Sequence, residues 1–233
     1  MNTTPQTFRI GINFGNALLT SRDADGSPRG IAVDLARELA RRAGASLELV
    51  SYDSAGRMAD RAKAGEWDVA FLATDPARAD EIVFTEPYLA VDTTYLVWTD
   101  APFAVPADLD CEGVRISVSD RSAYDLFLTR TLKHARLIRA STPNESVELF
   151  FAGKLEALAG LRPLLIDVAD KHPGTRILDG SFMTVQQAVG VSKSRAELVP
   201  YVRDFVKDIK TSGLVARLAE KNNLRGISGT DPN

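Results

Sequence analysis

The most constraining feature of this sequence is an alternation of strand and helix patterns that occurs twice along its 233 residues. The first alternation runs from the apolar segment 8–13 to the apolar segment 67–73, and the second runs from 114–119 to 156–161. Such alternation is typical of parallel strands in one sheet with helices on its faces. We therefore expect an α/β fold with two lobes, each a mainly parallel sheet flanked by helices.

The element boundaries follow from apolar periodicity, turn residues and helix caps. The expected strands are 8–13, 46–52, 67–73, 93–98, 114–119, 136–140, 156–161 and 185–191. The expected helices are one carrying Ile31, Leu35 and Leu39 and ending at Gly44, then 55–65, 122–135, 143–153, 163–171, one opening with Ser194 and Glu197 in capping-box spacing, and 214–222.

Charge and composition exclude several classes of function. With 28 Lys+Arg against 31 Asp+Glu, the net charge of −3 indicates no nucleic-acid partner and no anionic membrane surface. A single cysteine and two histidines speak against a disulfide, a metal site built by the protein, or another cofactor. Residues 1–15 lack a basic start followed by an apolar run, so we expect no signal peptide in them.

One stretch carries a family resemblance. DVAFLATDPARADEIVFTEPYL (68–89) resembles the amino-acid type, family 3, of solute-binding proteins of ABC transporters, and GIAVDLARELARRAG and QQAVGV are similar to its first helix and a hinge crossing. The resemblance implies a type II periplasmic-binding fold, with lobe 1 at 1–88 and 188–233, lobe 2 at 93–183, and hinge crossings at 89–92 and 184–187. It also implies a monomer in the periplasm that serves an ABC transporter permease; a cytoplasmic location is the alternative.

Ligands of open α/β sheets bind outside the carboxyl ends of the strands, so residues there are the candidates. Ala73 and Thr74 end one strand, and Arg78 follows in the first turn of a short helix that Asp75 is expected to cap. A guanidinium holds a carboxylate through two parallel hydrogen bonds, and Arg78 matches the family's carboxylate-binding arginine. The alternative is a surface arginine paired with Asp75 or Glu81.

The loop after the first strand supplies neutral polar groups. Asn13, Phe14 and Asn16 are candidate ligand contacts; Asn13 matches a polar contact of the family, and Asn16 stands where the family carries an aromatic that covers the ligand. The alternative is a turn in which asparagine bonds its own backbone.

In the second half, Ser119 ends a strand, and Ser122 and Asp125 have the spacing of a helix N-cap. The amide of Ala123 would then point out of the helix start toward an anionic group, with Arg121 adding positive charge. The alternative is a plain helix start.

Leu161 and Arg162 complete the candidate set, and they depart from the family. Many amino-acid binders carry an aspartate at the position of Leu161, where it neutralises the ligand's ammonium. Either Glu86 or Asp120 supplies that charge, or the ligand has no α-ammonium, because a buried ammonium without a carboxylate is heavily penalised. Arg162 either contacts an anion or caps the neighbouring lobe surface.

The function that these residues indicate is capture of a small carboxylate-bearing solute, an amino acid or related organic anion, in a cleft between two lobes. The sequence contains no common catalytic motif, so we expect no enzyme. Two alternatives remain open: an enzyme resembling the cyclohexadienyl dehydratases, which need a buried acid, and a metabolite-sensing module.

Overall fold

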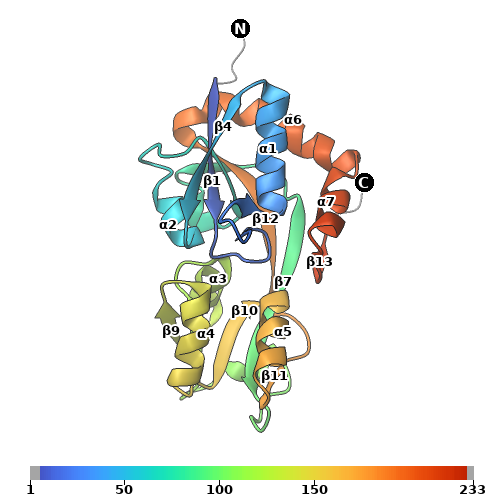
Figure 1. Cartoon of the computed structure of the whole chain (residues 1–233). Helices are drawn as coiled ribbons and strands as arrows, with labels where there is room; N and C mark the ends of the chain where they lie inside the picture. Colours follow the sequence, from blue (N-terminus) through green and yellow to red (C-terminus); the bar gives the residue numbers. More distant parts are fainter. Residues whose placement is uncertain (1–5, 230–233) are drawn as a thin grey trace. The chain divides into compact units, whose positions relative to one another are not determined.

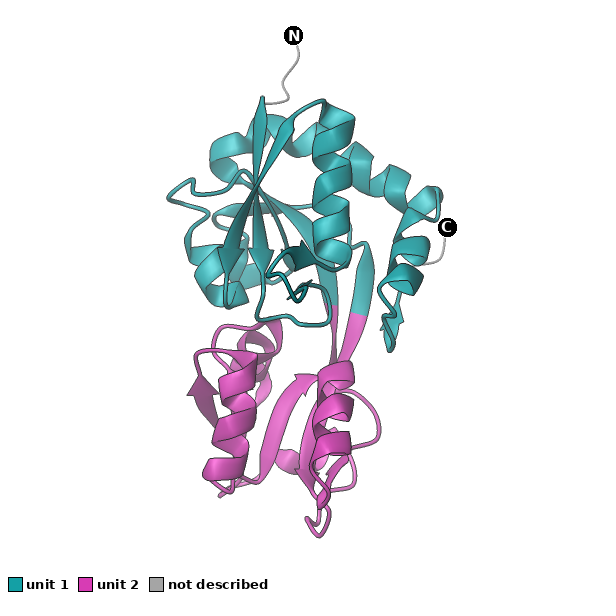
Figure 2. Ribbon diagram, in the orientation of Figure 1, with its two compact units in different colours: residues 1–90, 186–233 teal, residues 91–185 magenta. Residues whose placement is uncertain are grey.

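The computed structural model describes residues 6–229, and the chain divides into two compact units (Figure 2). Unit 1 comprises 1–90 and 186–233, and unit 2 comprises 91–185. The chain thus leaves unit 1 once and returns to it once, and both boundaries fall inside the segments 89–92 and 184–187. That these segments act as hinges stays a prediction.

Unit 1 contains the first alternation and the C-terminal helices (Figure 1). Its elements are β1 (Thr7–Asn13), β2 (Ser21–Arg22), β3 (Pro28–Arg29), α1 (Ile31–Ala43), β4 (Ser46–Tyr52), α2 (Ala55–Asp60), β5 (Val69–Ala73), the 3-10 turn η1 (Pro76–Arg78), β6 (Ile82–Phe84), most of β12 (Met183–Ser192), the 3-10 segment η3 (Lys193–Leu198), α6 (Val199–Thr211), α7 (Leu214–Lys221) and β13 (Ile227–Ser228). The strand order is β4-β1-β5-β12, in which the first three strands are parallel and β12 is antiparallel.

The strand β1 builds one face of the unit 1 core through its alternating side chains. Phe8, Ile10 and Ile12 are fully buried on one face, where the ring of Phe8 stacks on Tyr201 of α6 with 6.3 Å between centroids. The Tyr201 hydroxyl donates to the carbonyl of Leu39 on α1 at 3.3 Å, so α1 and α6 share this face. The strand predicted for 8–13 is therefore confirmed.

The opposite face of β1 receives α2, which is shorter than the predicted helix 55–65. Gly11 allows this approach, because a Cβ there would lie 3.1 Å from the sulfur of Met58. The helix ends at Asp60 instead of continuing to 65. The Met58 carbonyl accepts from the Trp67 indole at 2.9 Å and from the Arg61 amide at 3.3 Å, while the Ala62 amide, its partner in a continued α-helix, donates to Ala59 instead.

Unit 2 holds the second alternation. Its elements are most of β7 (Leu89–Trp98), the 3-10 turn η2 (Pro106–Leu109), β8 (Arg115–Ser119), α3 (Ala123–Thr131), β9 (Arg136–Ala140), α4 (Pro143–Ala152), β10 (Ala157–Leu161), α5 (Arg162–Lys171) and β11 (Thr175–Ile177). The strand order is β7-β10-β8-β9; β8, β9 and β10 are parallel, while β7 is antiparallel to β10.

Side chains of the unit 2 sheet have apolar partners on both faces, and helices α4 and α5 contribute to one of them. Leu96 of β7 and Leu158 of β10 are paired and join a buried cluster with Phe150 of α4 and Leu165 of α5. The neighbouring Tyr95 points to the other face, where its ring lies 4.6 Å from that of Phe182. The sheet therefore has an apolar layer on each side, as a parallel sheet requires.

Two further helix predictions were wrong at their ends. The predicted helix 122–135 stops at Thr131, because the carboxylate of Asp110 accepts hydrogen bonds from the backbone amides of 133–135 at 2.8–3.1 Å. These bonds also hold the pKa of Asp110 below its ordinary value. The expected capping box at Ser194 does not form; the Ser192 hydroxyl accepts from the Ser194 amide at 3.3 Å, and α6 begins only at Val199.

Within 6–229, no helix is both long enough and apolar enough to cross a membrane.

Candidate functional site

In unit 1 the candidate residues lie along one edge of the sheet. The parallel strands β1 and β5 end at Asn13 and Ala73, and their carboxyl ends share that edge. Ala73 pairs with Gln187 of β12, and the amide of Thr74 donates to the carbonyl of Gln186 at 2.9 Å. The edge that carries the candidates is therefore also the place where β12 enters this unit.

Arg78 lies directly beyond β5 in the short turn η1. The carboxylate of Asp75 accepts from the amide of Ala77 at 2.8 Å, so the cap predicted for Asp75 is confirmed. Arg78 is 6% exposed as a residue, and its Nη1 donates to the carbonyl of Ala73 at 2.6 Å. The alternative of a surface arginine does not describe it, because Arg78 is buried against the strand end.

In the loop after β1, one asparagine side chain bonds the loop's own backbone and another has a buried oxygen without a hydrogen-bond partner among the described residues. The Oδ1 of Asn13 accepts from the amide of Gly15 at 2.9 Å, which is the turn considered as its alternative role. The side-chain oxygen of Asn16 is buried and accepts no hydrogen bond from the described residues. A buried acceptor without a partner is costly, so a donor on a ligand would stabilise this atom.

Phe14 has a partner that sequence reasoning missed. The guanidinium of Arg22 lies over the Phe14 ring, 3.9 Å from its centroid, in cation–π geometry. Arg22 belongs to the short hairpin of β2 and β3, and its Nη1 donates to the carbonyl of Gly26. The only signal for this contact was an arginine in the polar turn that follows the strand.

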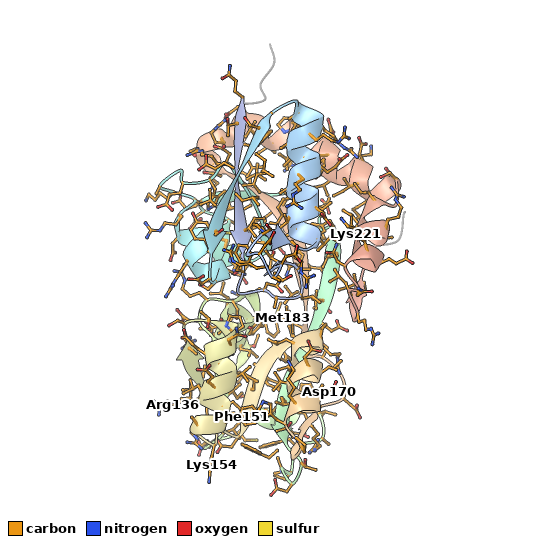
Figure 3. The ribbon with its side chains drawn as sticks, in the orientation of Figure 1. Arg136, Phe151, Lys154, Asp170, Met183 and Lys221 are labelled. Carbon is orange, nitrogen blue, oxygen red and sulfur yellow. The ribbon has the colours of Figure 1, made fainter. Side chains whose placement is uncertain are left out.

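In unit 2 the candidates again occupy the carboxyl edge of parallel strands. Ser119 ends β8 and Leu161 ends β10. Leu161 pairs with Thr93 of β7, whose hydroxyl donates to the carbonyl of Met183, the first residue of β12 (Figure 3). Both strands that connect the units therefore border the candidate edge of unit 2.

Ser122 caps α3 as its spacing predicts. Its hydroxyl accepts from the amide of Asp125 at 3.1 Å, and the Asp125 carboxylate accepts from the amide of Arg121 at 2.7 Å. Arg121 adopts a left-handed conformation with φ 55°, which turns the chain between Ser119 and the helix. Ala123, whose amide is the proposed anion contact, is the first residue of α3.

The serine hydroxyls at this helix start also contact a buried tyrosine. Tyr124 forms side-chain hydrogen bonds with Ser119 and Ser122. Burial raises the pKa of Tyr124 to about 12, so its hydroxyl stays protonated at neutral pH. Because both serines share this partner, their positions are set by the unit 2 core.

The acids near this edge are engaged by arginine. Asp125 is buried, and Arg139 of β9 donates its Nε to Asp125 at 3.0 Å. The same Nε lies 3.7 Å from the carboxylate of Asp120. Sequence reasoning treated Asp125 only as a cap residue and missed Arg139, which comes 14 residues later in the chain.

Leu161 and Arg162 begin α5 without a side-chain cap. Leu161 is buried, and its backbone forms the N-cap position of the helix. The Nη2 of Arg162 donates to the carbonyl of Gly180 within the same unit. This bond is a surface contact inside unit 2, whereas the alternative role for Arg162 was a cap on the neighbouring lobe surface.

Among residues 6–229, no group of three or more histidine, cysteine, aspartate or glutamate side chains is arranged to hold a metal ion.

Comparison with known proteins identifies the class to which this fold belongs. The L-cysteine solute receptor of Neisseria gonorrhoeae superposes with a TM-score of 0.81 at 24% identity, covering 93% of this chain and 89% of that one. An ancestral amino acid-binding protein, described as a precursor of cyclohexadienyl dehydratase, gives a TM-score of 0.78 at 22% identity over 93% and 95%. The fold is thus that of the type II periplasmic-binding proteins.

Sequence comparison then identifies the family. The model of the bacterial extracellular solute-binding proteins, family 3, matches residues 8–224, and the chain belongs to this family. The lysine/arginine/ornithine-binding periplasmic protein of Escherichia coli strain K12 is 23% identical over 228 residues, which cover 93% of this chain and 87% of the relative. The predicted family and fold are confirmed.

Proposed function

We propose that this protein is the solute-binding component of an ABC-type importer and captures a small carboxylate-bearing solute with residues of both units. Membership in a family of extracellular solute-binding proteins supports this role. The relatives' names refer to cysteine and to lysine, arginine or ornithine, and each of these amino acids carries a carboxylate.

One observation carries the proposal: in each unit the candidate edge is also the edge where the connecting strands pass. In unit 1 the amide of Thr74 bonds the Gln186 carbonyl, and in unit 2 Leu161 pairs with Thr93. A ligand at either edge therefore lies next to the chain that leads to the other unit. We propose that the segments 89–92 and 184–187 are hinges and that the ligand brings the candidate edges together.

Arg78 is the proposed anchor of the carboxylate. Its burial lowers the local dielectric, which strengthens a charge-assisted bond to an anion. Its Nη1 bond to the Ala73 carbonyl holds the guanidinium in place before a ligand arrives. A preorganised cation loses little side-chain entropy on binding.

The remaining assignments follow from this role. We propose that the protein works as a monomer outside the inner membrane and docks on a permease. Size-exclusion chromatography with light scattering tests the monomer, and fractionation of the native cells tests the location. A cytoplasmic pool would instead favour a metabolite-sensing module.

We propose a binding role without catalysis. A dehydratase of this fold needs a buried carboxylic acid that can donate a proton. Of the acids near the candidate edges, Asp75 is buried but its carboxylate caps η1 by accepting from the Ala77 amide, Asp120 lies beside Arg139, and Glu86 is exposed. Incubation with prephenate tests this directly, and phenylpyruvate above the level of a heat-inactivated sample would contradict it.

A ligand screen followed by calorimetry tests the proposed function. Thermal-shift measurements with amino acids, dicarboxylates and polyamines should reveal a solute that raises the melting temperature by mass action. X-ray scattering should then show a more compact protein with that solute than without it. Identical profiles at saturation would contradict closure.

Variants at Arg78 test the anchor. Arg78→Ala should weaken binding of that solute by about 2–5 kcal/mol, because the ligand's carboxylate loses its partner. Arg78→Lys should restore part of the loss, since an ammonium cannot form the paired hydrogen bonds. Arg37→Ala, at an exposed arginine of α1, is the matched control. If Arg78→Ala folds and binds within twofold of the wild type, Arg78 is not the anchor.

A further inference from the structure

We propose that Asn16 selects the ligand by accepting a hydrogen bond from an uncharged donor on it, a hydroxyl or a carboxamide N–H. This inference rests on the proposed function and names one specificity-determining contact, which lies within unit 1. It is carried by the side-chain oxygen of Asn16, which is buried and has no hydrogen-bond partner among residues 6–229. Such an oxygen lowers the stability of the fold, which favours a role for it in binding.

The backbone amides of the loop after β1 donate to other acceptors. The Gly15 amide donates to Oδ1 of Asn13 at 2.9 Å, and the Asn16 amide donates to the Asn13 carbonyl at 3.2 Å. The amides of Leu19 and Thr20 both donate to the backbone carbonyl of Asn16, at 3.0 Å each. The conformation of the loop is thus fixed by bonds in which the side-chain oxygen of Asn16 takes no part.

The same loop is held closely against the end of β4. The Phe14 amide donates to the Tyr52 carbonyl at 2.8 Å. A Cβ on Gly15 would lie 2.1 Å from the backbone oxygen of Asp53, so the loop backbone approaches this strand end as closely as a glycine allows. Because Asn16 is partly exposed as a residue, a rotation of its own side chain can turn the oxygen toward a ligand while the loop stays in place.

A second buried oxygen without a partner among the described residues, the hydroxyl of Tyr88, lies in a different setting. Tyr88 is fully buried, and its ring packs edge-on against Phe71 of β5 with 5.9 Å between centroids. Asn16 instead follows the carboxyl end of β1, which is where ligands of parallel sheets bind. Of the two oxygens, that of Asn16 is therefore the one placed for a solute.

The acids that follow the neighbouring strands favour an uncharged donor. An amide oxygen has no formal charge, so Asn16 does not neutralise a cation. The carboxylate of Asp53, after β4, lies 3.5 Å from Arg57. That of Asp75, after β5, accepts from the Ala77 amide at 2.8 Å. A cation desolvated beside Asn16 would compete with these partners for a counter-charge, whereas a hydroxyl or carboxamide needs only the acceptor.

Calorimetry with matched compounds tests the contact. L-Glutamine is compared with L-glutamate, L-serine with L-alanine, and L-malate with succinate, because the first of each pair carries an uncharged donor that the second lacks; L-lysine and L-arginine carry a charged one. We expect the tightest ligand of the wild type to have an uncharged donor and to bind roughly three- to tenfold more tightly than its counterpart, as one hydrogen bond allows. In Asn16→Leu, which removes the acceptor, the two should bind within about twofold of each other.

The stability of the same variant distinguishes a binding role from a structural one. Asn16→Leu removes an acceptor without a partner and should raise the urea midpoint by about 0.5 M, whereas Asn13→Leu removes the acceptor of the Gly15 amide and should lower it by about as much. Asn144→Leu, at an exposed asparagine of α4 in unit 2, is the matched control and should leave the affinities unchanged.

The outcomes separate this inference from the proposed function. If Asn16→Leu keeps the wild-type preference within the pair, or has a lower urea midpoint as Asn13→Leu does, Asn16 is structural and the solute-binding role stands. Tightest binding by L-lysine or L-arginine overturns the uncharged donor and also leaves that role. Binding of none of the compounds overturns both. Should Asn16→Leu fail to fold, the comparison of the pairs on the wild type decides.

Discussion

A buried aspartate that holds two arginines is expected to contribute more to the stability of unit 1 than any surface ion pair. Asp68 is fully buried, and its Oδ1 accepts from Nη2 of Arg9 and from Nη1 of Arg195 at 2.6 Å each. Its Oδ2 accepts from the backbone amide of Arg9 at 3.0 Å. We predict that Asp68→Asn destabilises the protein, because Arg9 loses its carboxylate partner and Arg195 keeps only its ion pair with Glu197.

The structure sets the size of the effect. Removing one partner of a buried ion pair costs about 3–5 kcal/mol. The two arginine side chains are 36% and 26% exposed, so water solvates part of each charge after the substitution. Asparagine also keeps one acceptor oxygen. We therefore expect a loss of about 2–4 kcal/mol in the free energy of unfolding.

Fluorescence during urea unfolding measures this loss within the right unit. The chain has two tryptophans, Trp67 in unit 1 beside Asp68 and Trp98 in unit 2. In a Trp98→Phe background, Trp67 alone reports the unfolding of unit 1. At a slope of about 2 kcal/mol per molar of urea, the midpoint should fall by about 1–2 M.

An exposed aspartate provides the control for Asp68→Asn and sets the result that would contradict the prediction. Asp204 is an exposed aspartate of α6, and Asp204→Asn should leave the midpoint unchanged. If Asp68→Asn unfolds within ~0.25 M of Asp204→Asn, equivalent to about 0.5 kcal/mol, the ion cluster contributes no more than a surface pair.

Two further predictions concern local structure. Gly30→Ala should lower the free energy of unfolding by about 1–3 kcal/mol, because φ is +113° and the new Cβ would lie 2.4 Å from the Leu19 carbonyl oxygen. Gly26→Ala, at φ +84° with open space around it, should cost less in the same urea experiment; equal losses would exclude the clash as the cause. Two arginines of α1 lower the pKa of Glu38 to about 2, so this carboxylate stabilises the fold above its unfolded pKa and loses that contribution as pH falls from about 5 to 2. Urea midpoints should show Glu38→Gln less stable than the wild type at pH 7 by about 0.5–1 kcal/mol and equal to it near pH 2; a constant difference would contradict the assignment.

Sequence patterns predicted those features of the candidate edges that depend on residues close together in the chain, such as helix caps. Asp75 before Pro76 and Ser122 before Asp125 were identified as helix caps, because a cap bonds an amide two or three residues away. The same reasoning predicted that Arg78 follows a strand end. It could not show that Arg78 is buried with its guanidinium on the Ala73 carbonyl, because the burial of a side chain depends on the tertiary packing around it.

The helix ends were wrong where a distant side chain intervenes. Trp67 donates to the Met58 carbonyl at the end of α2. After α3, the backbone amides bond the carboxylate of Asp110, which precedes the first of them, Lys133, by 23 residues in the sequence. Hydrophobic periodicity continues past both ends, so no sequence pattern signals the stop. The ion pairs between Asp68 and Arg195 and between Asp125 and Arg139 were missed for the same reason.

By itself the sequence determined the order of strands and helices, the class of fold and most caps, because periodic burial and cap hydrogen bonds act within a few residues. The tertiary structure decided which polar groups are buried and what each one bonds. The buried side-chain oxygen of Asn16 has no partner among the described residues. The Arg22 guanidinium lies over the Phe14 ring, and Arg139 pairs with the carboxylate of Asp125. These outcomes depend on which strands become neighbours, and a buried charge or amide is stable only beside a partner that the fold brings to it.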